Sequence, residues 1–153
     1  MPEPDDIDRR LLKLLQEDAT MPMAALAERA GMSVGPCWRR IERMERDGVI
    51  LGREVEIDWR ALGYEMRVFL RIVLDKSARN AFDEFLAAAR ELPEVVAVET
   101  LLGRVDLRMD VIARDLAHYQ EIYRDRILGL PHIAEIDALM LVSELKNSAR
   151  LPL

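Results

Sequence analysis

Four arginines stand close together in the stretch SVGPCWRRIERMERDG, residues 33–48, of a 153-residue chain whose formal net charge is −6. Between residues 33 and 46 they are accompanied by only two glutamates, which leaves a local excess of positive charge. Guanidinium groups form hydrogen bonds with phosphates and with the O6 and N7 edge of guanine. An acidic chain can still bind nucleic acid, because the position of the positive charge matters more than its sum.

Helical periodicity prevails in the first sixty residues, which must position these arginines. The first predicted helix lies in DDIDRRLLKLLQED, where the leading aspartates suit the positive end of the helix dipole. Its apolar face comprises Ile7, Leu11, Leu14 and Leu15. The second, in MAALAERAGM, buries Leu26, Ala27 and Ala30 and stops at Gly31. The third covers residues 34–47, with Ser33 as the N-cap, Pro36 in the first turn and Gly48 at the end.

The second and third helices, joined by a tight turn, are typical of a helix-turn-helix, in which the later helix enters the major groove of DNA. Spacing predicts an inward stripe of Val34, Cys37, Ile41 and Met44. The outward residues are then Gly35, Arg39, Glu42, Arg43 and Arg46, flanked by Trp38 and Arg40. The alternative is a solvated amphipathic helix with ion pairs four residues apart, such as Glu42 with Arg46.

Two short β-rich runs follow, Val49–Ile50 and Glu54–Ile57, and they predict a small wing with Arg53 at its tip. There Arg53 would either contact a phosphate or simply be solvated. The predicted DNA-contacting residues are Ser33, Gly35, Pro36, Trp38, Arg39, Arg40, Arg43, Arg46 and Arg53.

The second half of the chain has the order β-α-β-β-α-β. The predicted strands lie in YEMRVFLRIVL, EVVAVETLLG, RVDLRMDVIAR and HIAEIDALMLVSELK. One helix follows Ser77 as its cap and ends before Pro93, and the other runs from the cap Asp115 to Leu128. The expected fold is α+β, with a winged helix-turn-helix domain over residues 1–60 and a ferredoxin-like βαββαβ domain over residues 61–153.

Strand alternation predicts one uncovered sheet face that mixes charged and apolar residues. In the third strand, Val105, Leu107, Met109 and Val111 would point inward and Arg104, Asp106, Arg108 and Asp110 outward. The other residues expected on this face are Arg67, Phe69, Arg71, Val73, Glu99 and Ile112. Such a face suits an isologous homodimer, and the alternative is an ordinary solvated face.

Four motifs occur in order: IDRRLLKLLQED, SVGPCW, GVILG and GRVD. With them the whole chain resembles the Lrp/AsnC (leucine-responsive/asparagine-operon, feast/famine) transcriptional regulators. The resemblance implies a sequence-specific regulator that binds double-stranded DNA through its N-terminal domain. It also implies a C-terminal domain that forms homodimers, tetramers or octamers and binds a small effector, usually an amino acid.

The resemblance places the effector near the loop before the third strand, with help from the last strand. The residues so implied are Leu102, Gly103, Arg104, Val105, Asp106 and Ala138. Backbone N–H groups at Gly103, the carboxylate of Asp106 and the guanidinium of Arg104 would meet a zwitterion. Leu102 and Ala138 depart from the small polar residue and the threonine frequent in relatives. The alternatives are a plain turn at Gly103 and an interface ion pair at Asp106.

Several classes of function are disfavoured. No apolar run is long enough to span a bilayer, and the acidic N-terminus is unlike a signal peptide, so a cytoplasmic protein without membrane contact is expected. Cys37 is the single cysteine and is expected to pack rather than to sense redox state. No cofactor, metal site or enzyme motif is predicted. Sirohaem decarboxylases, which resemble the same architecture, remain the alternative, although His118 and His132 form no converging site. The four arginines of residues 33–48 also disfavour a third alternative, an interaction module of the same architecture that no longer binds DNA.

Overall fold

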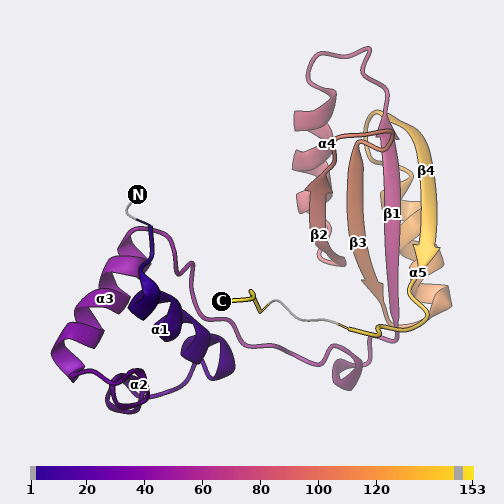
Figure 1. Cartoon of the computed structure of the whole chain (residues 1–153). Helices are drawn as coiled ribbons and strands as arrows, with labels where there is room; N and C mark the ends of the chain where they lie inside the picture. The colour runs from indigo at the N-terminus through magenta and orange to yellow at the C-terminus, as the bar shows by residue number, and fades with distance from the viewer. Residues whose placement is uncertain (1–2, 147–149) are drawn as a thin grey trace. The chain divides into compact units, whose positions relative to one another are not determined.

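The computed structural model describes residues 3–146 and 150–153, and the chain divides into two compact units (Figure 1). The helical unit comprises the residues up to Glu56 together with Lys146–Leu153, and the sheet unit comprises Ile57–Leu145. The C-terminal residues join the helical unit because Leu151 exchanges hydrogen bonds with the Gln16 side chain, at 2.6 Å and 3.3 Å. Each unit has its own hydrophobic core.

The three predicted helices of the helical unit are confirmed as α1 (Asp6–Glu17), α2 (Met23–Ala30) and α3 (Val34–Arg46). Gly31 ends α2 in the left-handed conformation, with φ 72°, which glycine adopts at low cost. Ser33 occupies the N-cap position of α3, although its side chain makes no capping hydrogen bond. The core that joins the helices comprises Leu11, Leu14, Leu26, Ala27, Ala30, Cys37, Ile41 and Met44.

Two predictions for this unit are wrong. Val34 does not face inward, because at the first position of α3 it lies beyond the reach of the core and remains 48% exposed. The predicted wing strands are also not formed. Residues 51–57 are all exposed and pair with no strand, since the apolar Leu51 and Val55 have no sheet to pack against.

The β-α-β-β-α-β order of the sheet unit is confirmed. Its elements are β1 (Met66–Leu74), α4 (Ala81–Arg90), β2 (Val95–Thr100), β3 (Leu107–Ala113), α5 (Leu116–Ile122) and β4 (Ile133–Met140). A short 3-10 turn, Arg60–Leu62, precedes β1, and a π-helical turn, Tyr123–Ile127, extends α5. The strands form an antiparallel sheet in the order β2-β3-β1-β4, which is the ferredoxin-like arrangement.

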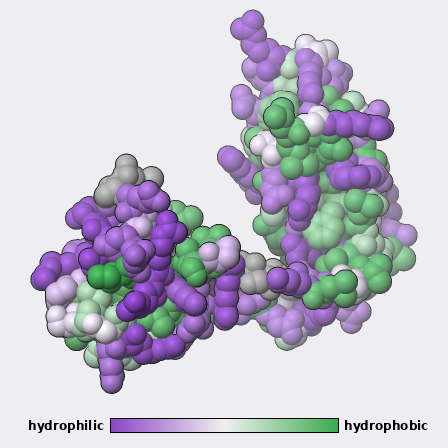
Figure 2. Space-filling model, in the orientation of Figure 1, coloured by the Kyte–Doolittle hydropathy of each residue, from purple (hydrophilic) through white to green (hydrophobic). Residues whose placement is uncertain are grey.

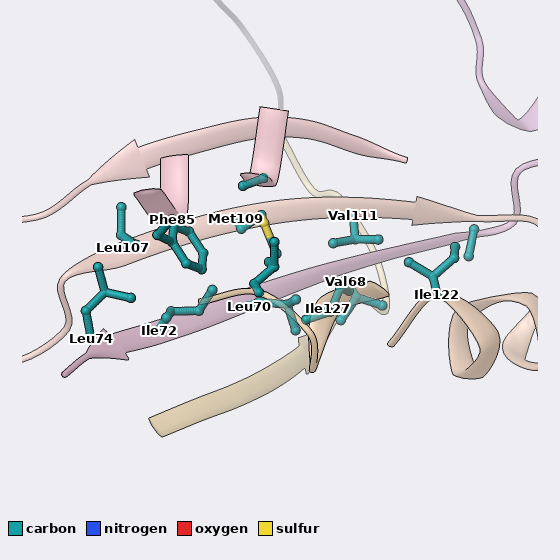
Figure 3. Close-up of a cluster of buried hydrophobic side chains, with 13 residues drawn as sticks. Val68, Leu70, Ile72, Leu74, Phe85, Leu107, Met109, Val111, Ile122 and Ile127 are labelled. Atoms are coloured by element: carbon teal, nitrogen blue, oxygen red, sulfur yellow. The ribbon is translucent and has the colours of Figure 1, made fainter. Parts of the chain in front are cut away.

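Both helices of the sheet unit pack on the same sheet face. Phe85 from α4, Ile122 from α5 and Ile127 from the following turn converge on the inward side chains of β1 and β3 (Figure 3). On the strands these side chains are Val68, Leu70, Ile72, Leu74, Leu107, Met109, Val111 and Ala113. Alternation along β1 therefore directs Arg67, Phe69 and Arg71 to the opposite sheet face, as predicted.

Element boundaries differ from the predictions at the start of α4 and at the start of β3. Helix α4 begins at Ala81 with Asn80 as its cap, so Ser77 is not the cap; its N–H donates to the Asp75 carboxylate at 2.9 Å in a separate turn. Strand β3 begins at Leu107, which leaves Val105 in the preceding loop. Asp115 caps α5 as predicted and accepts from the His118 N–H.

Candidate nucleic-acid interface and ligand site

The exposed face of α3 collects the arginines that the sequence places there. An open hollow of about 440 Å³ lies along the helix. It is lined by Pro36, Arg39, Arg40, Glu42, Arg43 and Arg46. All four arginines of the segment therefore border the same open hollow, where their guanidinium groups can contact phosphates. Hydrophilic residues predominate over the view of the helical unit in Figure 2.

The four arginines are not equivalent. Arg40 donates to Asp5 at 2.7 Å and to Asp8 at 2.8 Å, and Arg43 donates to Asp8 at 2.5 Å. Hydrogen bonds from the Asp8 N–H and the Arg40 guanidinium lower the pKa of Asp5, and its carboxylate in turn raises that of Arg40. Arg39 is exposed and forms no ion pair with any residue that the structure describes, whereas Arg46 lies 3.5 Å from the carboxylate of its neighbour Asp47.

The remaining predicted contacts lie at the start and beyond the end of α3. Ser33, Gly35, Pro36 and Trp38 are all exposed at its N-terminal part, and the Trp38 ring is 51% exposed. Arg53 forms an exposed ion pair with Glu45 at 3.3 Å rather than standing at the tip of a wing. The Glu42–Arg46 pair of the solvated-helix alternative does not form among the described residues, and Arg46 pairs with Asp47 instead. Cys37 is fully buried, and burial raises the pKa of its thiol, as expected of a packing residue.

In the sheet unit, the charged sheet face consists of Arg67, Phe69, Arg71, Arg108 and Asp110. Asp110 is 2% exposed and accepts from Arg67 at 2.7 Å and from Arg108 at 3.1 Å. Both guanidinium groups lie over the Phe69 ring, at 5.2 Å and 4.7 Å from its centroid. The charges of this face are therefore already paired within one chain, and Asp110 lies on the predicted face but is covered by these two arginines.

The flanks of the charged sheet face are paired in the same way. Arg71 forms an ion pair with Asp137 of β4, and Glu99 of β2 lies 3.4 Å from Arg108. Partly buried apolar residues, Val73 and Ile112, complete the face, and Leu139 beside Phe69 is more exposed. Hydrophobic and hydrophilic side chains lie next to one another on the sheet unit in Figure 2.

A second hollow, of about 380 Å³, lies at the edge of the sheet unit. It is lined by Arg71, Val73, Arg104, Val105, Glu135, Ile136 and Asp137. The structure thus brings two of the predicted effector residues, Arg104 and Val105, to a concave site. Within the described part of the chain, neither Arg104 nor Glu135 forms an ion pair, whereas Arg71 and Asp137 pair with each other.

Asp106 is buried instead of pointing outward. It is 6% exposed, and its carboxylate accepts from the Leu74 N–H at 3.0 Å and from the Lys76 ammonium at 2.6 Å. Hydrogen bonds from Lys76 and Leu74 lower the pKa of Asp106. The carboxylate is thus engaged within the chain and fastens the β2–β3 loop to the end of β1.

The other predicted effector residues lie outside this hollow's lining. Leu102 and Gly103 are exposed at the tip of the β2–β3 loop, and Ala138 pairs with Leu70 on β1, so its side chain is on the helix-covered side of the sheet. His118 accepts from the Arg114 N–H, and His132 lies 2.6 Å from Glu84, so the two histidines serve separate local contacts.

Sequence reasoning missed Asp8 and Glu135. Asp8 carried a signal, since it lies three residues before Leu11 of the predicted apolar face, but the leading aspartates were related only to the helix dipole. Glu135 lies on the predicted last strand, but only the pairing of β1 with β4 brings it opposite Val73 and beside Arg71. Sequence spacing could not reveal that neighbourhood.

Comparison with known proteins identifies both parts of the chain. Residues 4–50 match the winged helix-turn-helix DNA-binding family model, and residues 67–151 match the Lrp/AsnC ligand binding domain. The glutamate uptake regulatory protein of Zymomonas mobilis is 35% identical over 149 residues, covering 97% of this chain and 90% of the relative. The leucine-responsive regulatory protein of Salmonella typhimurium is 31% identical over 147 residues, covering 96% of this chain and 90% of the relative.

A solved structure agrees with these relatives. The crystal structure of an AsnC family transcriptional regulator from Agrobacterium tumefaciens superposes with a TM-score of 0.88 at 34% identity and covers 97% of this chain and 96% of that chain. The relatives compared are transcriptional regulators, which does not favour the tetrapyrrole-enzyme alternative. Among the described residues, no helix is long and apolar enough to cross a membrane. The chain belongs to the Lrp/AsnC family of DNA-binding transcriptional regulators.

Proposed function

We propose that the chain is an amino-acid-responsive regulator that binds duplex DNA in the cytoplasm through α3. The DNA-binding face is inferred from the hollow of about 440 Å³, because all four arginines of one exposed helix border it. Arg39 and Arg46 are its most accessible cations, and the anchored Arg40 and Arg43 lie between them. Ser33, Gly35, Pro36 and Trp38 form the N-terminal part of the same contact surface, and Arg53 flanks its far end.

The test is the double variant Arg39→Ala/Arg46→Ala, measured by fluorescence anisotropy with a duplex selected from a random pool by the wild-type chain. Affinity is expected to fall by about 100-fold, and the slope of log affinity against log salt concentration to decrease by about two. The matched control Arg9→Ala/Arg79→Ala removes two exposed arginines elsewhere and is expected to change affinity little. Equal losses in both double variants would show that α3 is not the reading helix.

For the effector, we place an α-amino acid in the hollow of about 380 Å³. Its carboxylate would be held by Arg104 and its ammonium by Glu135, because these two lining groups have opposite charge and no ion-pair partner in the described residues. This assignment replaces Asp106 as the ammonium partner, since that carboxylate is already bound by Lys76. Leu102, Gly103 and Ala138 would act from the surrounding loop and strand rather than as lining groups.

Two findings support an amino-acid effector. The domain that contains the hollow matches a ligand-binding domain model, and one relative of 31% identity is named for its response to leucine. Calorimetry with the twenty common amino acids should therefore detect binding to the wild type. Arg104→Ala and Glu135→Gln are each expected to weaken binding by more than tenfold, whereas Arg79→Ala should not. Unchanged affinity in both lining variants would place the effector elsewhere.

The charged sheet face is proposed to form the homodimer, from which tetramers or octamers can assemble. Its charges are neutralised within each chain, so two copies can meet around Phe69 and Leu139 without leaving an unpaired charge in the interface. A two-fold dimer presents two copies of α3, which predicts an imperfect palindrome with half-sites about 10 bp apart, or a multiple of that spacing. Light scattering at micromolar concentration tests the dimer, and a monomer would contradict it.

A further inference from the structure

The contact between α1 and α3 centres on one buried carboxylate. Asp8 is 1% exposed, although it lies in the first turn of α1, where carboxylates usually face solvent. Its Oδ1 accepts from Arg40 at 2.8 Å, and its Oδ2 accepts from Arg43 at 2.5 Å and from the Asp5 N–H at 3.1 Å. Asp5 returns a bond by accepting the Asp8 N–H at 2.8 Å, which completes a capping box.

The Asp8 carboxylate contacts α3 as well as the start of α1. The same carboxylate that caps α1 holds two arginines of α3, one turn apart, through a single nitrogen of each guanidinium group. A guanidinium has five N–H donors in a rigid plane, so most donors of Arg40 and Arg43 remain available. Both side chains are partly exposed, at 25% and 38%, and both border the hollow on α3.

We propose that Asp8 is a positioning residue for DNA recognition, which orients Arg40 and Arg43 so that α3 discriminates its operator from other DNA. This inference rests on the proposed role of α3 as the reading helix. A guanidinium group that is held by a carboxylate presents its remaining N–H donors in a fixed direction. A free arginine side chain is mobile and contacts DNA phosphates whatever the base sequence. Asp8 also neutralises part of the local positive charge, which lowers affinity for DNA in general.

The consequence is a change in discrimination rather than a uniform loss. In Asp8→Asn, the isosteric amide removes the negative charge, so Arg43 loses its carboxylate partner, Arg40 keeps only Asp5, and the surface gains one unit of positive charge. Affinity for the selected duplex is expected to fall, while affinity for an unrelated duplex of the same length stays constant or rises. The ratio of the two affinities should fall by about tenfold or more.

The experiment measures both affinities by fluorescence anisotropy with the full chain, over a range of salt concentrations. The matched control is Asp6→Asn, which removes the same charge from an exposed position in the same helical turn. Circular dichroism and thermal unfolding measure the folded fraction of every variant. Because Asp8→Asn removes a buried ion pair and could fold poorly, Arg43→Lys is the second variant, since it keeps the charge but lacks the planar fork.

Arg43→Lys is expected to lower the affinity ratio by severalfold without lowering affinity for the unrelated duplex. A proportional loss of both affinities in folded Asp8→Asn, or an unchanged ratio in Arg43→Lys, would overturn the positioning role. The proposed function fails differently, because an α3 that does not read DNA would leave the Arg39→Ala/Arg46→Ala variant with normal affinity. Discrimination lost in Asp8→Asn but kept in Asp6→Asn supports the inference.

Discussion

The two units each bury one carboxylate beneath two arginines, and we propose a different partner for each of the two clusters. In the helical unit Asp8 holds Arg40 and Arg43, while Arg39 forms no ion pair among the described residues and Arg46 pairs only with its exposed neighbour Asp47. In the sheet unit Asp110 holds Arg67 and Arg108, and further acids pair with the neighbouring arginines. We infer that local charge balance, rather than the presence of arginines, distinguishes the proposed DNA-binding surface from the proposed dimer interface.

Asp110→Ala tests the role of the buried carboxylate in the sheet unit, and it is expected to have the largest effect. It leaves two arginines facing each other over Phe69 without their shared carboxylate, so the sheet unit should lose about 3 kcal/mol of unfolding free energy. Urea unfolding followed by fluorescence can report on each unit, because Trp38 lies in α3 and Trp59 in the sheet unit. A Trp38→Phe background isolates the sheet unit. An unchanged midpoint there would mean that the ion pairs contribute nothing to its stability.

Leu139→Arg gives the charged sheet face an uncompensated positive charge and so tests whether charge balance permits dimer formation there. Leu139 is exposed beside Phe69, so the variant should fold normally while dimer affinity falls by about 100-fold. Analytical ultracentrifugation over a concentration series measures this dissociation. Leu62→Arg places the same charge on another exposed leucine of the sheet unit and should leave the dimer intact. Equal dimer affinities of the two variants would show that this face is not the dimer interface.

Periodicity predicted all three helices of the helical unit and the complete order of the sheet unit, because apolar spacing reflects burial directly. It failed where a residue's partner comes from elsewhere in the chain. Val49–Ile50 and Glu54–Ile57 have the composition of strands but find no pairing partner, and Asp8 is polar yet buried because two arginines of α3 reach it. Similarly, alternation placed Asp106 in solvent, whereas Lys76 and the Leu74 N–H enclose it.

Asp106 predicts a smaller, pH-dependent effect. Its pKa in the folded chain lies below the unfolded value of about 3.9, so its contribution is complete above that pH and is lost as pH falls through the folded pKa. Asp106→Asn should therefore lower stability by about 1 kcal/mol at neutral pH, because Lys76 is largely solvent-screened. The difference from wild type should shrink in acid, as measured by urea unfolding between neutral pH and pH of about 3. A difference that grows in acid would contradict the assigned ion pair.

The smallest effect is expected from chemical modification of Cys37. Burial raises the pKa of its thiol, so neither iodoacetamide nor hydrogen peroxide should modify it while the helical unit is folded. DNA affinity after such treatment should remain within about twofold of the untreated value. Mass spectrometry reports labelling, and urea-unfolded protein is the positive control. Rapid labelling of the native chain, with loss of DNA binding, would establish a redox role instead.

We expect the binding of an amino acid by the sheet unit to change the DNA affinity of the helical unit. The affinity of the full chain for its selected duplex is determined with and without a saturating amino acid identified by calorimetry, for wild type and for Arg104→Ala. A regulator of the proposed kind should change its DNA affinity by about 5- to 150-fold on adding the amino acid, and Arg104→Ala should abolish the change while retaining the affinity of the ligand-free protein. DNA affinity that is the same with and without every amino acid that binds would contradict the account.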